Sequence, residues 1–129
     1  MAKPEIMVID ENTKILFAFE SLLEKEGYIT ITAESGYQAL LKITAKKPRA
    51  IFVDISLPEK NNLETIARIQ EKASAIPIIL LTSQHMHEAD ALVDKYDASG
   101  YLEKPISIEG VRDILKTLGI KQKKNIRKV

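Results

Sequence analysis

The sequence predicts an α/β fold with a parallel sheet, and two observations support this prediction. Apolar runs rich in β-branched residues lie at 6–9, 51–53 and 78–81, and they do not alternate with polar residues. Such runs suit strands that are buried on both faces, as in a parallel sheet. Segments with helical periodicity lie between them, so strands and helices alternate along the chain. Five strand–helix pairs with right-handed crossovers are therefore expected.

The strands are expected in the following order. The run at 6–9 forms the first strand. Residues 28–32 form the second, and their alternating pattern is typical of a strand nearer an edge of the sheet. The runs at 51–53 and 78–81 form the third and fourth strands, and residues 100–102 form a short final one.

Helices are expected where apolar residues recur at helical spacing, at 15–23, 39–43, 63–69, 86–96 and 108–118. Asn12 or Thr13 is the candidate N-cap of the first helix. The fourth helix has the weakest apolar stripe of the five. Residues that stop a helix follow the other four stripes: Gly27, Pro48, Pro77 and Gly119.

Composition indicates one ordinary globular domain. The 129 residues are 45% hydrophobic and 29% charged, and the chain has no cysteine for disulfides or thiol chemistry. No apolar stretch is long enough for a signal peptide or a membrane span, so a cytoplasmic protein is expected. We expect one domain over residues 1–119 and a basic tail over residues 120–129.

The tail concentrates the positive charge of the chain. Residues 121–129 hold five basic residues and no acidic one, and the rest carries 14 basic and 18 acidic residues, a net charge of −4. The tail has no aromatic residue on which a base could stack. A solvated terminus is therefore a better interpretation than an arm that binds nucleic acid.

Polar residues follow the strands where the strands end. Asp10 and Glu11 follow the first, Asp54 the third, Thr82 the fourth and Lys104 the fifth. Ligands bind outside the carboxyl ends of the strands in open α/β sheets. These side chains are therefore expected to meet at one edge of the sheet.

This set of residue types has a natural chemistry. Carboxylates crowded together repel one another, so a hard divalent cation such as Mg²⁺ would neutralise them. A carboxylate can attack phosphorus to form an aspartyl-phosphate. A metal, a lysine and a hydroxyl would then hold the oxygens of the transferred group.

Four segments resemble the signature segments of response-regulator receiver domains: VIDEN at 8–12, VDISLP at 53–58, LLTS at 80–83 and YLEKP at 101–105. The resemblance covers about residues 4–118, and all four segments occur in order at strand ends. It implies a flavodoxin-like (βα)5 three-layer sandwich with a five-stranded parallel sheet of order 2-1-3-4-5.

The resemblance also implies a metal site and a phosphoacceptor. Asp54 matches the phosphoacceptor. Asp10 and Glu11 match the acidic pair that holds Mg²⁺ together with Asp54, and the backbone carbonyl of Ser56 matches a further ligand. Glu11 replaces the commoner aspartate of the family, and its extra methylene is expected to weaken metal binding without abolishing it.

Further residues match the switch of the family. Thr82 matches the hydroxyl that moves to bind the phosphoryl group, and Lys104 matches the lysine that pairs with it. Tyr101 matches the aromatic switch residue, which turns inward when Thr82 moves. The Lys104–Pro105 peptide bond matches one that is usually cis in the family.

The expected function is a phosphoryl-controlled interaction. The resemblance implies a sensor histidine kinase or a histidine phosphotransfer protein as the donor to Asp54. A separate target protein is expected to bind the phosphorylated chain and carry out the response, or the chain passes the phosphoryl group on as a step of a phosphorelay. The output face would include residues 86–96, 100–103 and 107–118, and the same face could join two copies as a homodimer.

Two other classes compete with this hypothesis. A receiver-like scaffold that is never phosphorylated is favoured only by Glu11. A dehalogenase-type phosphatase needs a second acid two residues after its nucleophile, and Ser56 stands there. The chain is therefore not expected to be an enzyme beyond Mg²⁺-dependent self-phosphorylation and slow autodephosphorylation.

Overall fold

The computed structural model describes residues 3–55, 61–83 and 88–120. One parallel sheet holds five strands in the order β2-β1-β3-β4-β5, which confirms the expected fold class and strand order. The strands are β1 (Glu5–Ile9), β2 (Ile29–Ala33), β3 (Ala50–Asp54), β4 (Ile78–Thr82) and β5 (Gly100–Glu103). The helices are α1 (Thr13–Lys25), α2 (Gly36–Lys46), α3 (Asn61–Lys72), α4 (Ala89–Lys95) and α5 (Ile108–Thr117).

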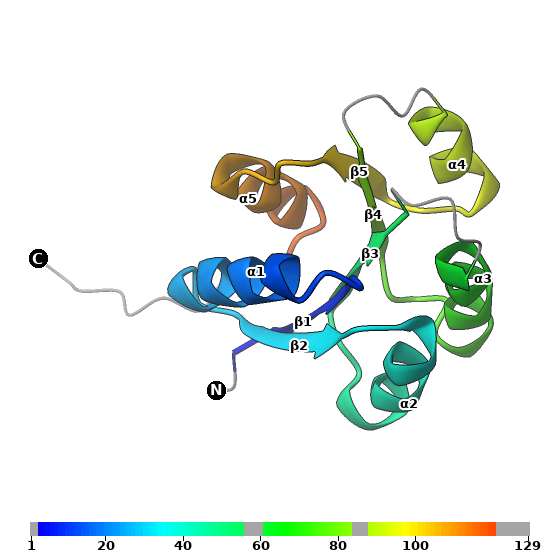
Figure 1. The fold of residues 1–129 in the computed structure, drawn as a ribbon, viewed down its shortest axis with the longest axis horizontal. Coiled ribbons are helices and arrows are strands. Elements are labelled where there is room, and N and C mark those ends of the chain that lie inside the picture. The colour runs from blue at the N-terminus through cyan, green and yellow to red at the C-terminus, as the bar shows by residue number, and fades with distance from the viewer. Residues whose placement is uncertain (1–2, 56–60, 84–87, 121–129) are drawn as a thin grey trace, which may run out of the picture.

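The helices cover both faces of the sheet. Helices α1 and α5 lie on one face, and α2, α3 and α4 lie on the other (Figure 1). Every residue of β3 and β4 is buried, and so are the last four of β1. These central strands are continuous apolar runs because both of their faces pack against helices. β2 lies at an edge of the sheet, as its alternating sequence predicted.

Local signals set most helix ends. The Asn12 side chain accepts the Lys14 N–H and so caps α1, which decides between the two candidate caps. Gly27 and Gly119 follow α1 and α5 with φ of 92° and 75°. α4 is shorter than the expected helix at 86–96, and residues 84–87 lie outside the described part of the chain.

The contact between α2 and α3 depends on Gly36. A Cβ atom added there would lie 1.8 Å from the hydroxyl oxygen of Thr65, which is buried. Gly36→Ala is therefore expected to lower the free energy of unfolding by about 1–3 kcal/mol, measured with urea. Adding Thr65→Ala removes the clashing hydroxyl and should recover part of that loss. A Gly36→Ala variant as stable as the natural chain would contradict this close approach.

Candidate functional site

Asp10 lies directly after β1, and its side chain is buried. Its carboxylate is held by two donors. One oxygen accepts the backbone N–H of Asn12 at 2.9 Å, and the other accepts a hydrogen bond from Lys104 Nζ at 2.9 Å. The carboxylate therefore points across the carboxyl edge of the sheet.

Asp54 is the last residue of β3 and is also buried. β3 pairs with β1, so the two acidic residues lie at neighbouring strand ends. Lys104 Nζ donates to Asp54 Oδ1 at 3.1 Å while it contacts Asp10. One ammonium group thus bridges two buried carboxylates.

Lys104 reaches this position from the other side of the site. It follows β5, and its backbone N–H donates to the carbonyl oxygen of Thr82 at 2.8 Å. The Lys104–Pro105 peptide bond is cis. The lysine side chain is only 21% exposed, so solvent screens its ion pairs less than it would on an open surface.

Burial and charge perturb both partners of the ion pair. Burial raises the pKa of Asp10, and the nearby Asp54 adds to this, against the opposing effects of the Asn12 N–H and of Lys104. Burial alone would lower the pKa of Lys104, but its hydrogen bonds and ion pairs with the two carboxylates outweigh it and raise that pKa. Two carboxylates and one ammonium leave this part of the site with a net charge of −1.

Asp10→Asn is expected to stabilise the metal-free protein at neutral pH. The amide oxygen can still accept the Asn12 N–H, and the like charge beside Asp54 is gone. Because the folded-state pKa of Asp10 is raised, the folded protein binds more protons, and the stability that Asp10 contributes falls as pH rises through that range.

The advantage of Asp10→Asn in free energy of unfolding should therefore grow between about pH 4 and about pH 7, measured with urea and EDTA. Asp113→Asn, at an exposed position of α5, is the matched control. An Asp10→Asn variant that is less stable than the natural chain at neutral pH would contradict the raised pKa.

Thr82 is the last residue of β4 and is fully buried. Its hydroxyl donates to the carbonyl oxygen of Leu102 at 3.5 Å, which is long for such a bond. Tyr101, in β5, pairs in register with Leu80 and is half-buried against the core under α2, α3 and α4. The Thr82 hydroxyl is thus held weakly at the same edge as the carboxylates.

The structure brings Asp10, Asp54 and Lys104 into direct contact. Glu11 follows Asp10 in the chain and its side chain is exposed, and Ser56 lies outside the described residues. Within the described ranges, no group of three or more Asp, Glu, His or Cys side chains could hold a metal ion. The two buried carboxylates are nevertheless oxygen donors with unbalanced negative charge, which is the chemistry that suits a hard divalent cation.

The hydrogen bond from the backbone N–H of Asn12 to the Asp10 carboxylate was not predicted from the sequence. The sequence pattern indicated Asn12 only as a helix cap. An aspartate that accepts a backbone N–H two residues later forms a local turn of a common kind, so the Asp10-Glu11-Asn12 segment carried a usable signal.

Comparisons with known proteins agree with this fold. The model of the response regulator receiver domain family matches residues 6–116. PilG of Pseudomonas aeruginosa is 36% identical over 119 residues, covering 87% of this chain and 84% of PilG. The polar-differentiation response regulator DivK of Brucella ovis is 30% identical over 114 residues, covering 87% of this chain and 93% of DivK.

A longer relative matches over part of its length. The alkaline phosphatase synthesis transcriptional regulatory protein PhoP of Bacillus subtilis is 30% identical over 114 residues, covering 88% of this chain but 48% of PhoP. The chain therefore spans about half of that regulator.

Solved structures share the fold. The chemotaxis protein CheY4 of Vibrio cholerae superimposes with a TM-score of 0.81 at 24% identity, covering 90% of this chain and 98% of CheY4. A response regulator receiver domain protein from Clostridium thermocellum superimposes with a TM-score of 0.79 at 24% identity, covering 88% of this chain and 92% of that one.

The architecture is thus the CheY-like, flavodoxin-like fold. The chain belongs to the response regulator receiver domain family of two-component signalling. Phosphorylation by a kinase is the general function of this family, and receiver domains are in general signalling modules. In the described part of the chain, no helix combines the length and apolarity that crossing a membrane requires.

Proposed function

We propose that this chain accepts a phosphoryl group on Asp54 in a Mg²⁺-dependent reaction and thereby switches a surface that binds a partner protein. The donor would be a sensor histidine kinase or a histidine phosphotransfer protein. The observation that supports this most is the contact of Lys104 Nζ with both Asp10 and Asp54, at the edge where the strands end.

The transfer is a substitution at phosphorus. An oxygen of the Asp54 carboxylate forms the new P–O bond, the bond from phosphorus to the donor breaks, and the donor keeps that electron pair. Lys104 stays close enough to pair with a phosphoryl oxygen, which compensates the charge that the group adds. The acceptor is buried beside these groups, so they are already in position when transfer occurs.

Mg²⁺ would be held by the carboxylates of Asp10, Glu11 and Asp54 and by the backbone carbonyl of Ser56. When bound, it supplies positive charge that compensates the net charge of −1 on the side chains of Asp10, Asp54 and Lys104. These residues would also orient the Asp54 carboxylate toward the incoming group.

Thr82 and Tyr101 would transmit the change. The Thr82 hydroxyl leaves its long bond to the Leu102 carbonyl and donates to the phosphoryl group, and Tyr101 moves inward toward the space that this opens. The affected surface consists of α4, β5 and α5. A separate target protein would read it there, and the same face is the candidate for a phosphorylation-dependent homodimer.

Incubation with acetyl phosphate tests the proposal. Intact mass is recorded with Mg²⁺ and with EDTA, and a gain of a single phosphoryl group only with Mg²⁺ is expected. No gain and no detectable Mg²⁺ binding would instead favour the scaffold that is never phosphorylated, with Glu11 as the cause. A gain that is equal in EDTA would contradict the metal dependence.

A further inference from the structure

The C-terminal half of α5 is tied to the end of α1 by a forked ion pair. Arg112 Nε and Nη2 donate to the two carboxylate oxygens of Glu26, at 2.7 Å and 2.8 Å. Glu26 is the C-cap residue of α1, and its side chain is only 12% exposed. Two parallel bonds from a planar guanidinium to a planar carboxylate fix the orientation of both groups as well as the distance between them. The ion pair therefore holds α5 in one position against the end of α1.

A buried hydrogen bond adds a second contact where α5 ends. The chain turns back at Gly119, whose φ is 75°, and buries Ile120 in the core beside Tyr28. There the carbonyl oxygen of Ile120 accepts a hydrogen bond from the Tyr28 hydroxyl at 3.2 Å. Burial raises the pKa of Tyr28, and Glu26 adds to this, so the hydroxyl keeps its proton and remains a donor at neutral pH.

The N-terminal end of α5 lacks contacts of this kind. Within the described ranges, no hydrogen bond or ion pair joins residues 105–110 to another element. The Ser107 side chain accepts the N–H of Gly110, which caps the helix without holding it to a neighbour. The first buried residue of the helix is Val111. In the part of the chain that the structure describes, polar contacts thus fasten α5 to other elements only from Arg112 onward.

The first turn of α5 lies close against β5. A Cβ atom added to Gly110 would lie 3.3 Å from Cδ2 of Leu102, so little space separates this turn from the Leu102 side chain. The carbonyl oxygen of Leu102 accepts the long hydrogen bond from the Thr82 hydroxyl. The residue that Thr82 would release on phosphorylation is therefore in contact range of the end of α5 that is not fastened.

We propose that the contacts of Glu26 with Arg112 and of Tyr28 with Ile120 form a clamp, and that α5 pivots about this clamp when the chain is phosphorylated. This inference rests on the proposed function. A hydrogen-bonded helix moves as a unit, so displacement at one end and a fixed point at the other produce a rotation.

The clamp limits the surface that a partner protein can use to recognise the phosphorylated chain. The first turn of α5 moves with β5, while the clamped half presents the same surface in both states. A partner that distinguishes the two states therefore contacts α4, β5 and the first turn of α5.

Amide hydrogen exchange of the full, unphosphorylated chain, followed by NMR, tests the clamp by itself. The N–H groups of Leu118 and Ile120 donate to carbonyl oxygens within α5, and they stay protected while the end of this helix is held. Arg112→Gln and Tyr28→Phe should each speed their exchange by about fivefold, since each removes hydrogen bonding that holds this end. Unchanged exchange in both variants would overturn the clamp.

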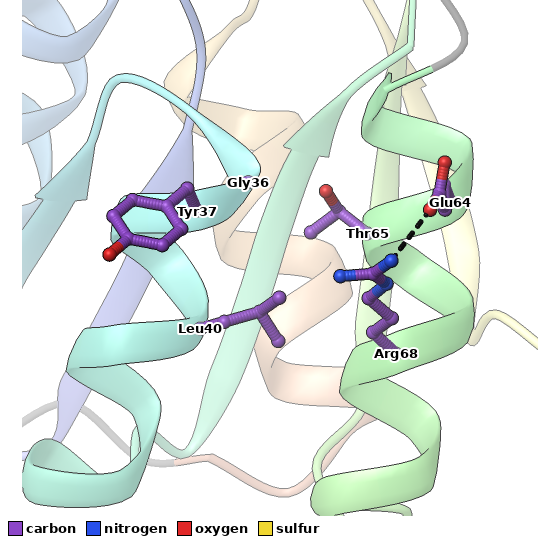
Figure 2. A pocket seen from close by; sticks show the side chains of 6 residues that line it. All are labelled: Gly36, Tyr37, Leu40, Glu64, Thr65 and Arg68. Atoms are coloured by element: carbon purple, nitrogen blue, oxygen red, sulfur yellow. Dashed lines mark hydrogen bonds and ion pairs between the residues drawn. The ribbon is translucent and has the colours of Figure 1, made fainter.

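Arg68→Gln is the matched control. It removes the arginine of another ion pair with a glutamate, the pair that Arg68 forms with Glu64 at 2.8 Å (Figure 2). Both residues of this pair lie on α3, so its loss should leave the exchange of Leu118 and Ile120 unchanged.

Amide chemical shifts recorded in excess acetyl phosphate and Mg²⁺ test the pivot. Phosphorylation should move the resonances of Leu102 and Gly110 and leave those of Leu118 and Ile120 in place. In the double variant Tyr28→Phe/Arg112→Gln, the resonances at both ends of α5 should move, because the clamp is gone. Equal changes at both ends of α5 in the natural chain would overturn the pivot.

The intact mass of the same samples separates this inference from the proposed function. Phosphoryl uptake should be equal in the natural chain and the double variant, because Tyr28 precedes β2 and so lies at the edge of the sheet opposite Asp54. A natural chain that takes up no phosphoryl group would refute the proposed function. Lys104→Met, which frees the segment after β5 without phosphorylation, then tests the pivot, and it should move the resonances of the first turn of α5 but not those of Leu118 and Ile120.

Discussion

Asp54→Asn is expected to gain no phosphoryl group from acetyl phosphate at any Mg²⁺ concentration, while the natural chain gains one. The amide is nearly the same size as the carboxylate and can still accept a hydrogen bond from Lys104. It lacks the anionic oxygen that attacks phosphorus. The effect should therefore be a complete loss of uptake rather than a slower reaction, seen as an unchanged intact mass after prolonged incubation.

The matched control is Asp113→Asn, which removes an exposed carboxylate of α5 and should leave uptake unchanged. Thermal unfolding of Asp54→Asn checks that the fold survives, and no loss of stability is expected because Lys104 keeps its bond to Asp10. Uptake of a phosphoryl group by Asp54→Asn would show that another residue is the acceptor and would refute the assignment.

Lys104→Met should have the second largest effect, on both stability and reaction. The variant leaves two buried carboxylates without the cation that contacts both of them. Breaking such a pair from one side costs about 3 kcal/mol, and this should appear as a lower free energy of unfolding in EDTA at neutral pH. The rate of phosphoryl uptake should fall by roughly 10²–10³-fold, because a charge positioned for the transferred group is lost.

Mg²⁺ and acid should each rescue part of the stability of Lys104→Met. The metal replaces the missing positive charge, and acid neutralises Asp10, whose pKa is already raised by burial. Lys116→Met, which removes an exposed lysine of α5, is the control and should be close to neutral. A Lys104→Met variant as stable as the natural chain in EDTA would contradict the bridging role of Lys104.

The sequence predicted the strands well because a strand that is buried on both faces is a continuous apolar run. The runs at 51–53 and 78–81 lie within β3 and β4, and each observed strand extends beyond its run by one or two residues. The end of the fourth helix was predicted to within one residue, since α4 ends at Lys95 with Tyr96 as its C-cap. Its start at Ala89 was not predicted, because the N-cap residue Glu88 makes no side-chain cap hydrogen bond and so gives no local capping signal.

The meeting of Asp10, Asp54 and Lys104 could also be predicted, because the carboxyl ends of parallel strands share one edge. The contact of Lys104 with both carboxylates could not be predicted. Lys104 is 94 residues from Asp10 in the sequence and 50 from Asp54, and only the packed structure shows that one flexible side chain reaches both carboxylates. The strand order likewise came from family resemblance, since the periodicity of separate segments says nothing about which strands are neighbours.

The anchoring of Lys104 has a mechanical consequence. Its backbone N–H is hydrogen-bonded to the last residue of β4, and its ammonium group forms ion pairs with the acidic residues at the ends of β1 and β3. Lys104 therefore connects four strands, because it also follows β5 directly in the chain. The segment after β5 cannot lift away unless the backbone bond and both ion pairs break together. If Asp54 is phosphorylated as we propose, the added charge would act directly on Lys104, and we expect the resulting movement to reach β5 and α5, to which Lys104 is connected through the chain.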